Sequence, residues 1–197
     1  MLTSLSPITS KVYHALIKID VSTDTVEEAK KVYTNGILSV TDCSSIHADE
    51  QQERNMFETY NLAYETHFVD FIHQVYALNS DKSVIVETQI NELDNVTLLR
   101  ILTILDYRDK LMFLDMIKDS SKSKFVTRDV KILEMLTRLA TRNLLCSTFH
   151  FLSKEFTVCC LPDLTFSVFV SDFDCFDTYL ELAAKSHLNL CNLQVKY

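Results

Sequence analysis

The chain has 197 residues, a formal net charge of −8 and six cysteines, but only two prolines and a single glycine. Average glycine usage of about 7% would give roughly 14 glycines in a chain of this length. The scarcity excludes phosphate-binding loops, dinucleotide-binding turns and the glycine-dependent nucleophile elbow, because each of these motifs needs at least two glycines. The apolar fraction of 47% and the charged fraction of 23% are typical of a folded globular protein.

The length predicts one globular domain over residues 1–197, for which a subdivision into 1–91 and 92–197 is the alternative. No apolar run approaches the roughly 20 residues that span a bilayer. The first residues also lack the basic and apolar regions of a secretory signal, so we expect an intracellular, cytoplasmic protein without membrane contact. In that compartment reduced, mostly buried thiols are expected for all six cysteines: Cys43, Cys146, Cys159, Cys160, Cys175 and Cys191.

The N-terminal quarter predicts a strand followed by a helix. Apolar and polar residues alternate over 12–21, a period of two that is typical of a half-buried strand. Residues 22–35 then show helical spacing, with Thr23 or Asp24 as the N-cap and Gly36 as a left-handed C-cap. The alternative for Asn35-Gly36 is a type I′ hairpin turn.

The middle of the chain predicts mainly helices. Residues 41–55 are polar, acidic and without periodicity, which indicates a mobile loop. Helical spacing of apolar and aromatic residues follows over 56–78, and 83–90 has the pattern of a strand. A helical stretch over 93–118, broken near Asp106, precedes another helix over 126–145.

The C-terminal quarter predicts a β-β-α-β unit. Residues 155–161 and 164–170 flank Pro162-Asp163, and a two-residue loop there would place residue 159 opposite 166. Ser171 then caps a helix that runs to about Ser186, and 191–197 alternate as a last strand. The fold class is therefore α+β, with a helix-rich middle between an N-terminal strand-helix unit and this C-terminal unit. The expected apolar face of the hairpin is Thr157, Cys159, Leu161, Leu164, Phe166 and Val168.

Three short motifs have the spacing of metal ligands. Cys43 with His47 and Cys146 with His150 are Cys-x-x-x-His pairs, and Asp70-x-x-His73 has the carboxylate-x-x-His spacing of di-iron bundles. Nothing in the sequence brings the two Cys-His pairs together, and a di-iron site would need a second copy of the Asp-x-x-His motif. We therefore expect no metal, no cofactor and no catalytic residue. Because catalytic triads are spatial, an enzyme without a recognisable motif remains the third hypothesis.

Basic residues gather between positions 118 and 142. Seven basic residues against three acidic ones give this window a net charge of +4, which leaves −12 for the rest of the chain. A helix with a basic stripe before a hairpin has the order of a winged-helix reader, so nucleic-acid binding through helix 126–145 is the alternative function. A solvated helix face, with Glu134 paired to Arg138, explains the same pattern structurally. The candidate nucleic-acid contacts are Lys122, Lys124, Arg128, Lys131, Arg138 and Arg142.

Acidic residues line one face of the helix expected after Ser171. Asp174, Asp177 and Glu181 lie within an arc of about 80° and are candidate contacts for a basic protein partner, although a solvated, dipole-compensating face is the simpler reading. Such complementarity is typical of inhibitors of basic proteins. The leading prediction is a non-catalytic regulatory protein that binds another protein, as an antagonist or immunity-type inhibitor.

Overall fold

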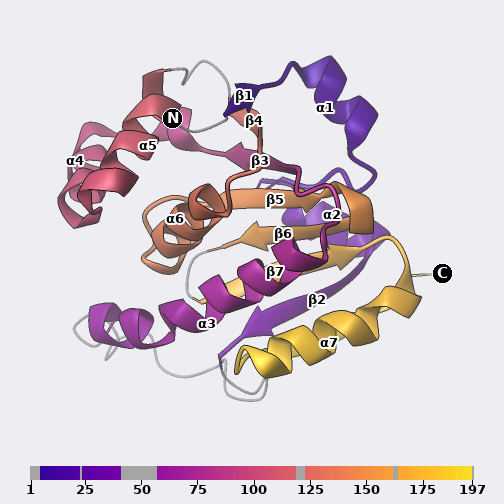
Figure 1. Cartoon of the computed structure of the whole chain (residues 1–197). Helices are drawn as coiled ribbons and strands as arrows, with labels where there is room; N and C mark the ends of the chain where they lie inside the picture. The colour runs from indigo at the N-terminus through magenta and orange to yellow at the C-terminus, as the bar shows by residue number, and fades with distance from the viewer. Residues whose placement is uncertain (1–4, 23, 41–56, 119–122, 162–163, 197) are drawn as a thin grey trace.

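An eight-stranded antiparallel sheet runs through the centre of the protein in the computed structural model (Figure 1). Across the sheet the strand order is β1-β4-β3-β5-β6-β7-β2-β8. The structure describes residues 5–22, 24–40, 57–118, 123–161 and 164–196, without the side chains of 57–61 and Asp174. The strands are β1 (Ser6–Pro7), β2 (Thr34–Ser39), β3 (Val84–Thr88), β4 (Lys124–Thr127), β5 (Ser147–Phe151), β6 (Phe156–Cys160), β7 (Thr165–Val170) and β8 (Asn189–Gln194).

Seven α-helices surround the sheet within the described ranges. Helices α3, α6 and α7 cover one face, α2 lies behind the other, and the α4–α5 pair extends from one end (Figure 1). This arrangement confirms the predicted α+β class. The helices are α1 (Ser10–Leu16), α2 (Val26–Val32), α3 (Phe57–Leu78), α4 (Asn95–Ile104), α5 (Tyr107–Lys118), α6 (Val130–Thr141) and α7 (Phe176–Lys185), with short 3₁₀ turns η1 (Ile90–Glu92), η2 (Leu152–Lys154) and η3 (Phe173–Cys175).

The hydrophobic core is divided by the sheet into a large and a small cluster. The large cluster lies under α3, α6 and α7, where the rings of Phe156 and Tyr179 stack with their centroids 3.8 Å apart. The small cluster lies under α2 and consists of Ile19, Val21, Val26, Ala29, Cys159 and Phe169. Strands β5 and β6 are consequently buried along their whole length. None of the described helices is long and apolar enough to cross a membrane.

The strand predicted over 12–21 is wrong, because residues 10–16 form α1. Tyr13 and Ile17 would lie on the same face of a strand, because they are separated by an even number of residues. Being four residues apart, they also lie on one side of a helix. The Thr9 side chain caps this helix by accepting a hydrogen bond from the Val12 N–H at 3.4 Å. Ile19 and Val21 are buried in a segment without regular secondary structure, which pairs with no strand in the described part of the chain.

The helix predicted over 22–35 is shorter than expected and Gly36 does not cap it. Helix α2 covers only Val26–Val32, and Gly36 lies inside β2 with a negative φ. Space at this position is tight, because a Cβ atom would lie 3.1 Å from Leu190 Cδ1, 3.2 Å from Phe176 Cζ and 3.3 Å from the Cys191 carbonyl oxygen. Neither the C-cap nor the hairpin turn proposed for Asn35-Gly36 is present.

Replacing Gly36 with alanine is therefore expected to destabilise the protein. The added methyl would force the Leu190 and Phe176 side chains and the Cys191 carbonyl to shift by a few tenths of an ångström, and overpacking of this kind costs about 1–3 kcal/mol. Urea denaturation should show a lower midpoint at an unchanged slope. Ala184→Leu, which adds volume on the exposed side of α7, is the control and should leave the midpoint nearly unchanged. An unaltered midpoint for Gly36→Ala would contradict the close approach.

The helices and strand predicted in the middle of the chain are confirmed in most respects. Helix α3 matches 56–78, β3 matches 83–90, and 93–118 divides into α4 and α5 at Asp106 as predicted. The break has a clear cause, since Asp106 Oδ1 accepts the Asp109 N–H at 2.8 Å and thereby begins a new helix. The helix predicted over 126–145 begins only at Val130, because Lys124–Thr127 pair with β3 as β4. The predicted loop 41–55 lies outside the described residues.

The C-terminal β-β-α-β order is confirmed, but the hairpin register differs by one residue. Cys159 lies opposite Ser167, and Thr157 lies opposite Phe169. Leu164 has a φ of 53°, and a left-handed residue at this point adds one position to the connection. Hydrophobicity does not specify this register, because both faces of β6 and β7 are covered. Helix α7 begins at Phe176 rather than after Ser171, whose hydroxyl instead donates to Glu155 Oε2 at 2.6 Å.

Four of the six cysteines are free thiols, which confirms the predicted reduced state for them. Cys159 and Cys160 are fully buried, and burial raises the pKa of Cys159 to about 12. Cys146 and Cys175 are only half-buried. The prediction of a reduced thiol is wrong for Cys191, which is disulfide-bonded, and Cys43 lies outside the described residues.

Candidate functional site

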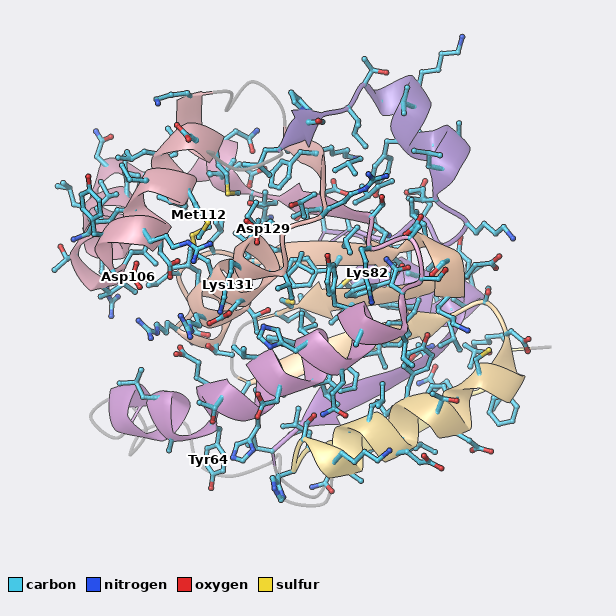
Figure 2. All side chains as sticks on the ribbon, in the orientation of Figure 1. Tyr64, Lys82, Asp106, Met112, Asp129 and Lys131 are labelled. Carbon is cyan, nitrogen blue, oxygen red and sulfur yellow. The ribbon has the colours of Figure 1, made fainter. Side chains whose placement is uncertain are left out.

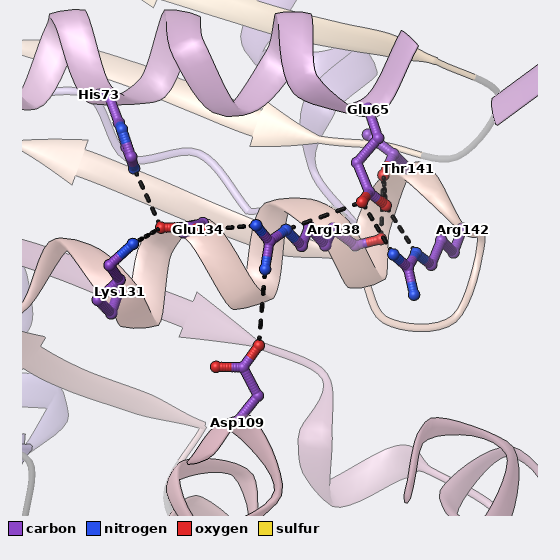
Figure 3. A network of polar contacts seen from close by, with 8 residues as sticks. All are labelled: Glu65, His73, Asp109, Lys131, Glu134, Arg138, Thr141 and Arg142. Carbon is purple, nitrogen blue, oxygen red and sulfur yellow. Dashed lines mark hydrogen bonds and ion pairs between the residues drawn. The ribbon is translucent and has the colours of Figure 1, made fainter. Parts of the chain in front are cut away.

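A network of charged side chains joins α6 to α3 and α5 (Figure 3). Helix α6 forms because its apolar residues share one face and Asp129 caps it by accepting the Lys131 N–H at 3.0 Å. Arg142 donates two hydrogen bonds to the Glu65 carboxylate, from Nε to Oε2 at 2.6 Å and from Nη2 to Oε1 at 2.8 Å. Paired, planar contacts of this type are among the stronger hydrogen bonds in proteins.

Glu134 is the second centre of this network. Its carboxylate accepts hydrogen bonds from Lys131 Nζ at 2.6 Å and Arg138 Nη2 at 2.5 Å, and His73 Nε2 lies 3.4 Å away. Burial opposes ionisation of Glu134, but Lys131, Arg138 and His73 outweigh it and lower the pKa. Arg138 also forms two longer ion pairs: its Nε lies 3.7 Å from Glu65 Oε1, and its Nη1 lies 3.7 Å from Asp109 Oδ2.

Three of the six predicted nucleic-acid contacts belong to this network. Lys131, Arg138 and Arg142 are matched by Glu65, Asp109 and Glu134, so three positive charges meet three negative ones. Phosphate binding depends on uncompensated positive charge. The Glu134–Arg138 pair that explained part of the stripe from sequence is present in the structure.

The other three predicted nucleic-acid contacts lie elsewhere. Lys122 is outside the described residues. Lys124 belongs to β4, where its Nζ lies 3.2 Å from Glu87 Oε1 and 3.7 Å from the centre of the Tyr13 ring. Arg128 precedes α6 and donates from Nε to Ser83 Oγ at 2.9 Å. The structure therefore does not bring the described members of the set together as one basic surface.

The acidic candidates on α7 are exposed as predicted. Asp177 and Glu181 both face solvent, and Glu181 lies 3.8 Å from Lys185 one turn later. Asp174 belongs to η3, and its side chain lies outside the described part. Helix α7 thus presents Asp177 and Glu181 to solvent.

A buried polar cluster lies on the sheet face beneath α1, and the sequence did not indicate it. The Tyr13 hydroxyl lies 2.8 Å from Glu87 Oε2 and 3.0 Å from His150 Nε2. His150 Nδ1 in turn lies 3.0 Å from Thr157 Oγ1. Tyr13 is one of the apolar residues that alternate over 12–21, but only the folded sheet brings it to β3 and β5.

Burial dominates the ionisation of this cluster. His150 is 2% exposed, and burial together with the Lys124 charge lowers its pKa to about 3. Burial and the neighbouring Glu87 carboxylate raise the pKa of Tyr13. The adjoining cavity, lined by the end of α1 and the residues directly after it and by His150 and Thr157, has a volume of only about 40 Å³. A cavity of this size holds a few water molecules at most.

The residues with metal-ligand spacing do not converge. Asp70 is exposed, and His73 faces Glu134 instead. His150 belongs to the Tyr13 cluster, whereas Cys43 and His47 lie outside the described residues. Among the side chains that the structure describes, no group of three or more His, Cys, Asp and Glu residues could hold a metal ion.

Large apolar side chains are exposed on α4 and α5, at the end of the molecule where both helices project outward (Figure 2). Val96 is 77% exposed, Leu99 66% and Tyr107 79%. The opposite sides of the two helices are buried through residues such as Ile101 and Phe113. We call this feature the α4–α5 apolar surface and define it as Val96, Leu99, Ile104, Tyr107, Leu111 and Leu114.

A groove lies between the start of α4 and the connection from α6 to β5. Its volume is about 300 Å³. Asp94 caps α4 at its edge by accepting the N–H groups of Val96 and Thr97, both at 2.8 Å. These hydrogen bonds lower the pKa of Asp94 and keep its carboxylate charged. The lining residues are Gln89, Glu92, Leu93, Asp94, Thr97, Asn143, Leu144, Leu145 and Cys146.

Comparisons with known proteins give no match. No protein-family model matches the chain, and neither a curated protein nor a solved structure matches it.

Proposed function

We propose that this chain is a non-catalytic protein-binding module that docks a protein partner on the α4–α5 apolar surface. The single observation that carries the proposal is the exposure of six large apolar side chains on two adjacent helices. Isolated exposed apolar residues are common, but a concentration of them is typical of interaction surfaces. Tyr107, with an apolar ring and a polar hydroxyl, is also the kind of residue enriched at such interfaces.

The polar chemistry of the chain supports binding over catalysis. The Tyr13–His150 cluster is closed by α1 and adjoins only a water-sized cavity. The network around Glu134 pairs each of its three acidic side chains with a basic one. In both places the ionisable groups hold elements of the fold together. An inhibitor or immunity-type role, supported by the net charge of −8 and by Asp177 and Glu181 on α7, is a narrower form of the proposal.

The alternative of nucleic-acid binding has less support from this geometry. Arg138 and Arg142 are turned toward carboxylates of α3 and α6, and Lys124 packs over Tyr13. Salt-dependent binding of the protein to duplex DNA would revive the alternative.

Affinity capture from host extract tests the proposal with charged substitutions on exposed apolar residues. We expect a stoichiometric partner with the wild-type bait and at least about a tenfold loss with Val96→Glu/Leu99→Glu, since a charge facing an apolar partner is costly. The matched control is Val32→Glu/Leu62→Glu, which changes two similarly exposed residues on α2 and α3. Equal capture by all three baits, or no stoichiometric partner, would refute docking on this surface. Gel filtration with light scattering shows whether the partner is a second copy of the chain.

A further inference from the structure

The groove at the start of α4 adjoins the α4–α5 apolar surface, because Val96 directly precedes its lining residue Thr97. We propose that this groove receives an arginine side chain of the protein partner. The inference rests on the proposed function above and adds the chemistry by which the partner is recognised. It predicts a partner segment that presents an arginine next to apolar residues.

The charge around the groove favours a cation. Among the described residues that line it none is basic, whereas Glu92 and Asp94 are both acidic. The Asp94 carboxylate compensates the positive end of the α4 dipole, since it accepts the first N–H groups of that helix. Glu92 is exposed, and its carboxylate has no hydrogen bond or ion pair with another described residue. One negative charge thus remains available to a partner.

The walls of the groove fit a long side chain with a planar cationic end. Leu93, Leu144 and Leu145 supply apolar surface, against which the methylene stem of an arginine can pack. Gln89 also lines the groove; its amide nitrogen donates to Asp24 Oδ1 at 3.0 Å, while its amide oxygen is an acceptor, and a guanidinium can bond several acceptors in one plane. The volume of about 300 Å³ is at the lower end of the roughly 300–1,000 Å³ of small-ligand pockets, which suits one anchoring side chain rather than a larger ligand.

The test uses N-acetyl-arginine amide as the probe, added to the whole ¹⁵N-labelled protein at low salt. We expect amide shifts at groove residues such as Glu92, Thr97 and Leu144, with saturation at millimolar probe. N-acetyl-citrulline amide, which has nearly the same shape but no charge, should shift none of them. Glu92→Gln should weaken the apparent affinity for the arginine probe about twofold to fivefold, the range expected for one exposed ion pair. Asp70→Asn, which removes the same charge at an exposed position on α3, should leave it unaltered.

The outcomes separate the groove from the wider proposal. Absence of groove shifts with the arginine probe, or equal shifts with citrulline, would overturn the arginine site. If capture still depended on Val96 and Leu99, the proposed docking surface would stand without it. If capture were independent of Val96 and Leu99, the proposed function would fail even though the groove bound arginine.

Discussion

Arg142→Met is expected to lower the free energy of unfolding by about 2–3 kcal/mol. The substitution leaves the Glu65 carboxylate, which is 7% exposed, with the Thr141 hydroxyl at 3.3 Å and Arg138 Nε at 3.7 Å. Removing one partner of a fully buried pair costs about 3–5 kcal/mol, because a charge is left without compensation. The Arg142 side chain is itself partly exposed, so we place the expected loss below that range.

The double variant Glu65→Leu/Arg142→Met distinguishes the cost of the uncompensated Glu65 charge from the cost of lost packing. Replacing both partners by apolar side chains of similar volume is often neutral, so the double variant should recover most of the loss. Lys185→Met, which removes the exposed partner of Glu181 on α7, should change stability by less than about 1 kcal/mol. Urea denaturation provides the measurement on five proteins: the wild type, the single variants Glu65→Leu and Arg142→Met, the double variant, and Lys185→Met. A double variant as unstable as the sum of its single variants would contradict the proposed origin of the loss.

The same network shows why the basic stripe could be recognised from sequence but its use could not. The residues of α6 specify a helix with a charged side, and that prediction is confirmed from Val130 onward. The carboxylates opposite are on other elements, since Glu65 lies 77 residues before Arg142. Helical periodicity describes one element at a time and contains no information on which helix packs against it. Only the Glu134–Arg138 pair, four residues apart on α6, was visible locally.

The sequence pattern also left features of the sheet unpredicted. Alternation predicted β6 and β7 as a hairpin, but the register depends on the left-handed Leu164 and on which face of the sheet each helix covers. At Gly36, asparagine followed by glycine has the local chemistry of a turn, and the close approach of Leu190 and Phe176 overrides it. The α4–α5 apolar surface was missed because the sequence pattern alone predicts that apolar residues of a helix are buried. Whether another element covers them depends on the fold. Long-range packing therefore decides the features that the helical and strand periods leave open.

Acidification from pH 7.5 to pH 5 is expected to lower the free energy of unfolding by about 2 kcal/mol through His150 alone. Burial first, and the Lys124 charge second, lower the pKa of His150 in the folded protein to about 3, whereas an exposed histidine titrates near 6.5. Between these values the unfolded chain binds a proton that the folded chain does not, so falling pH favours unfolding by up to about 1.4 kcal/mol per pH unit. The contribution is present above pH 6.5 and is lost progressively toward pH 3.

The surroundings of His150 make this assignment testable. The groups that face it are Tyr13 from α1, Thr157 from β6 and, through Tyr13, Glu87 and Lys124. The carboxylates whose pKa values are lowered in the fold, such as Glu134, also lose stability in acid, but in the unfolded chain they titrate around pH 4.5, so most of their effect falls below pH 5. The window from pH 7.5 to pH 5 therefore reports mainly on the histidines.

Urea denaturation across that window should show the fall in the wild type and its loss in His150→Gln, which keeps a polar group between Tyr13 and Thr157 but does not titrate. His14→Gln, at an exposed position on α1, is the matched control and should retain the fall. The His150 ring resonances of the wild type should also show no protonation between pH 7.5 and pH 5, a measurement that does not require the variant to fold. Protonation of the ring within this range, or an equal fall in His150→Gln, would refute the buried, neutral state of His150.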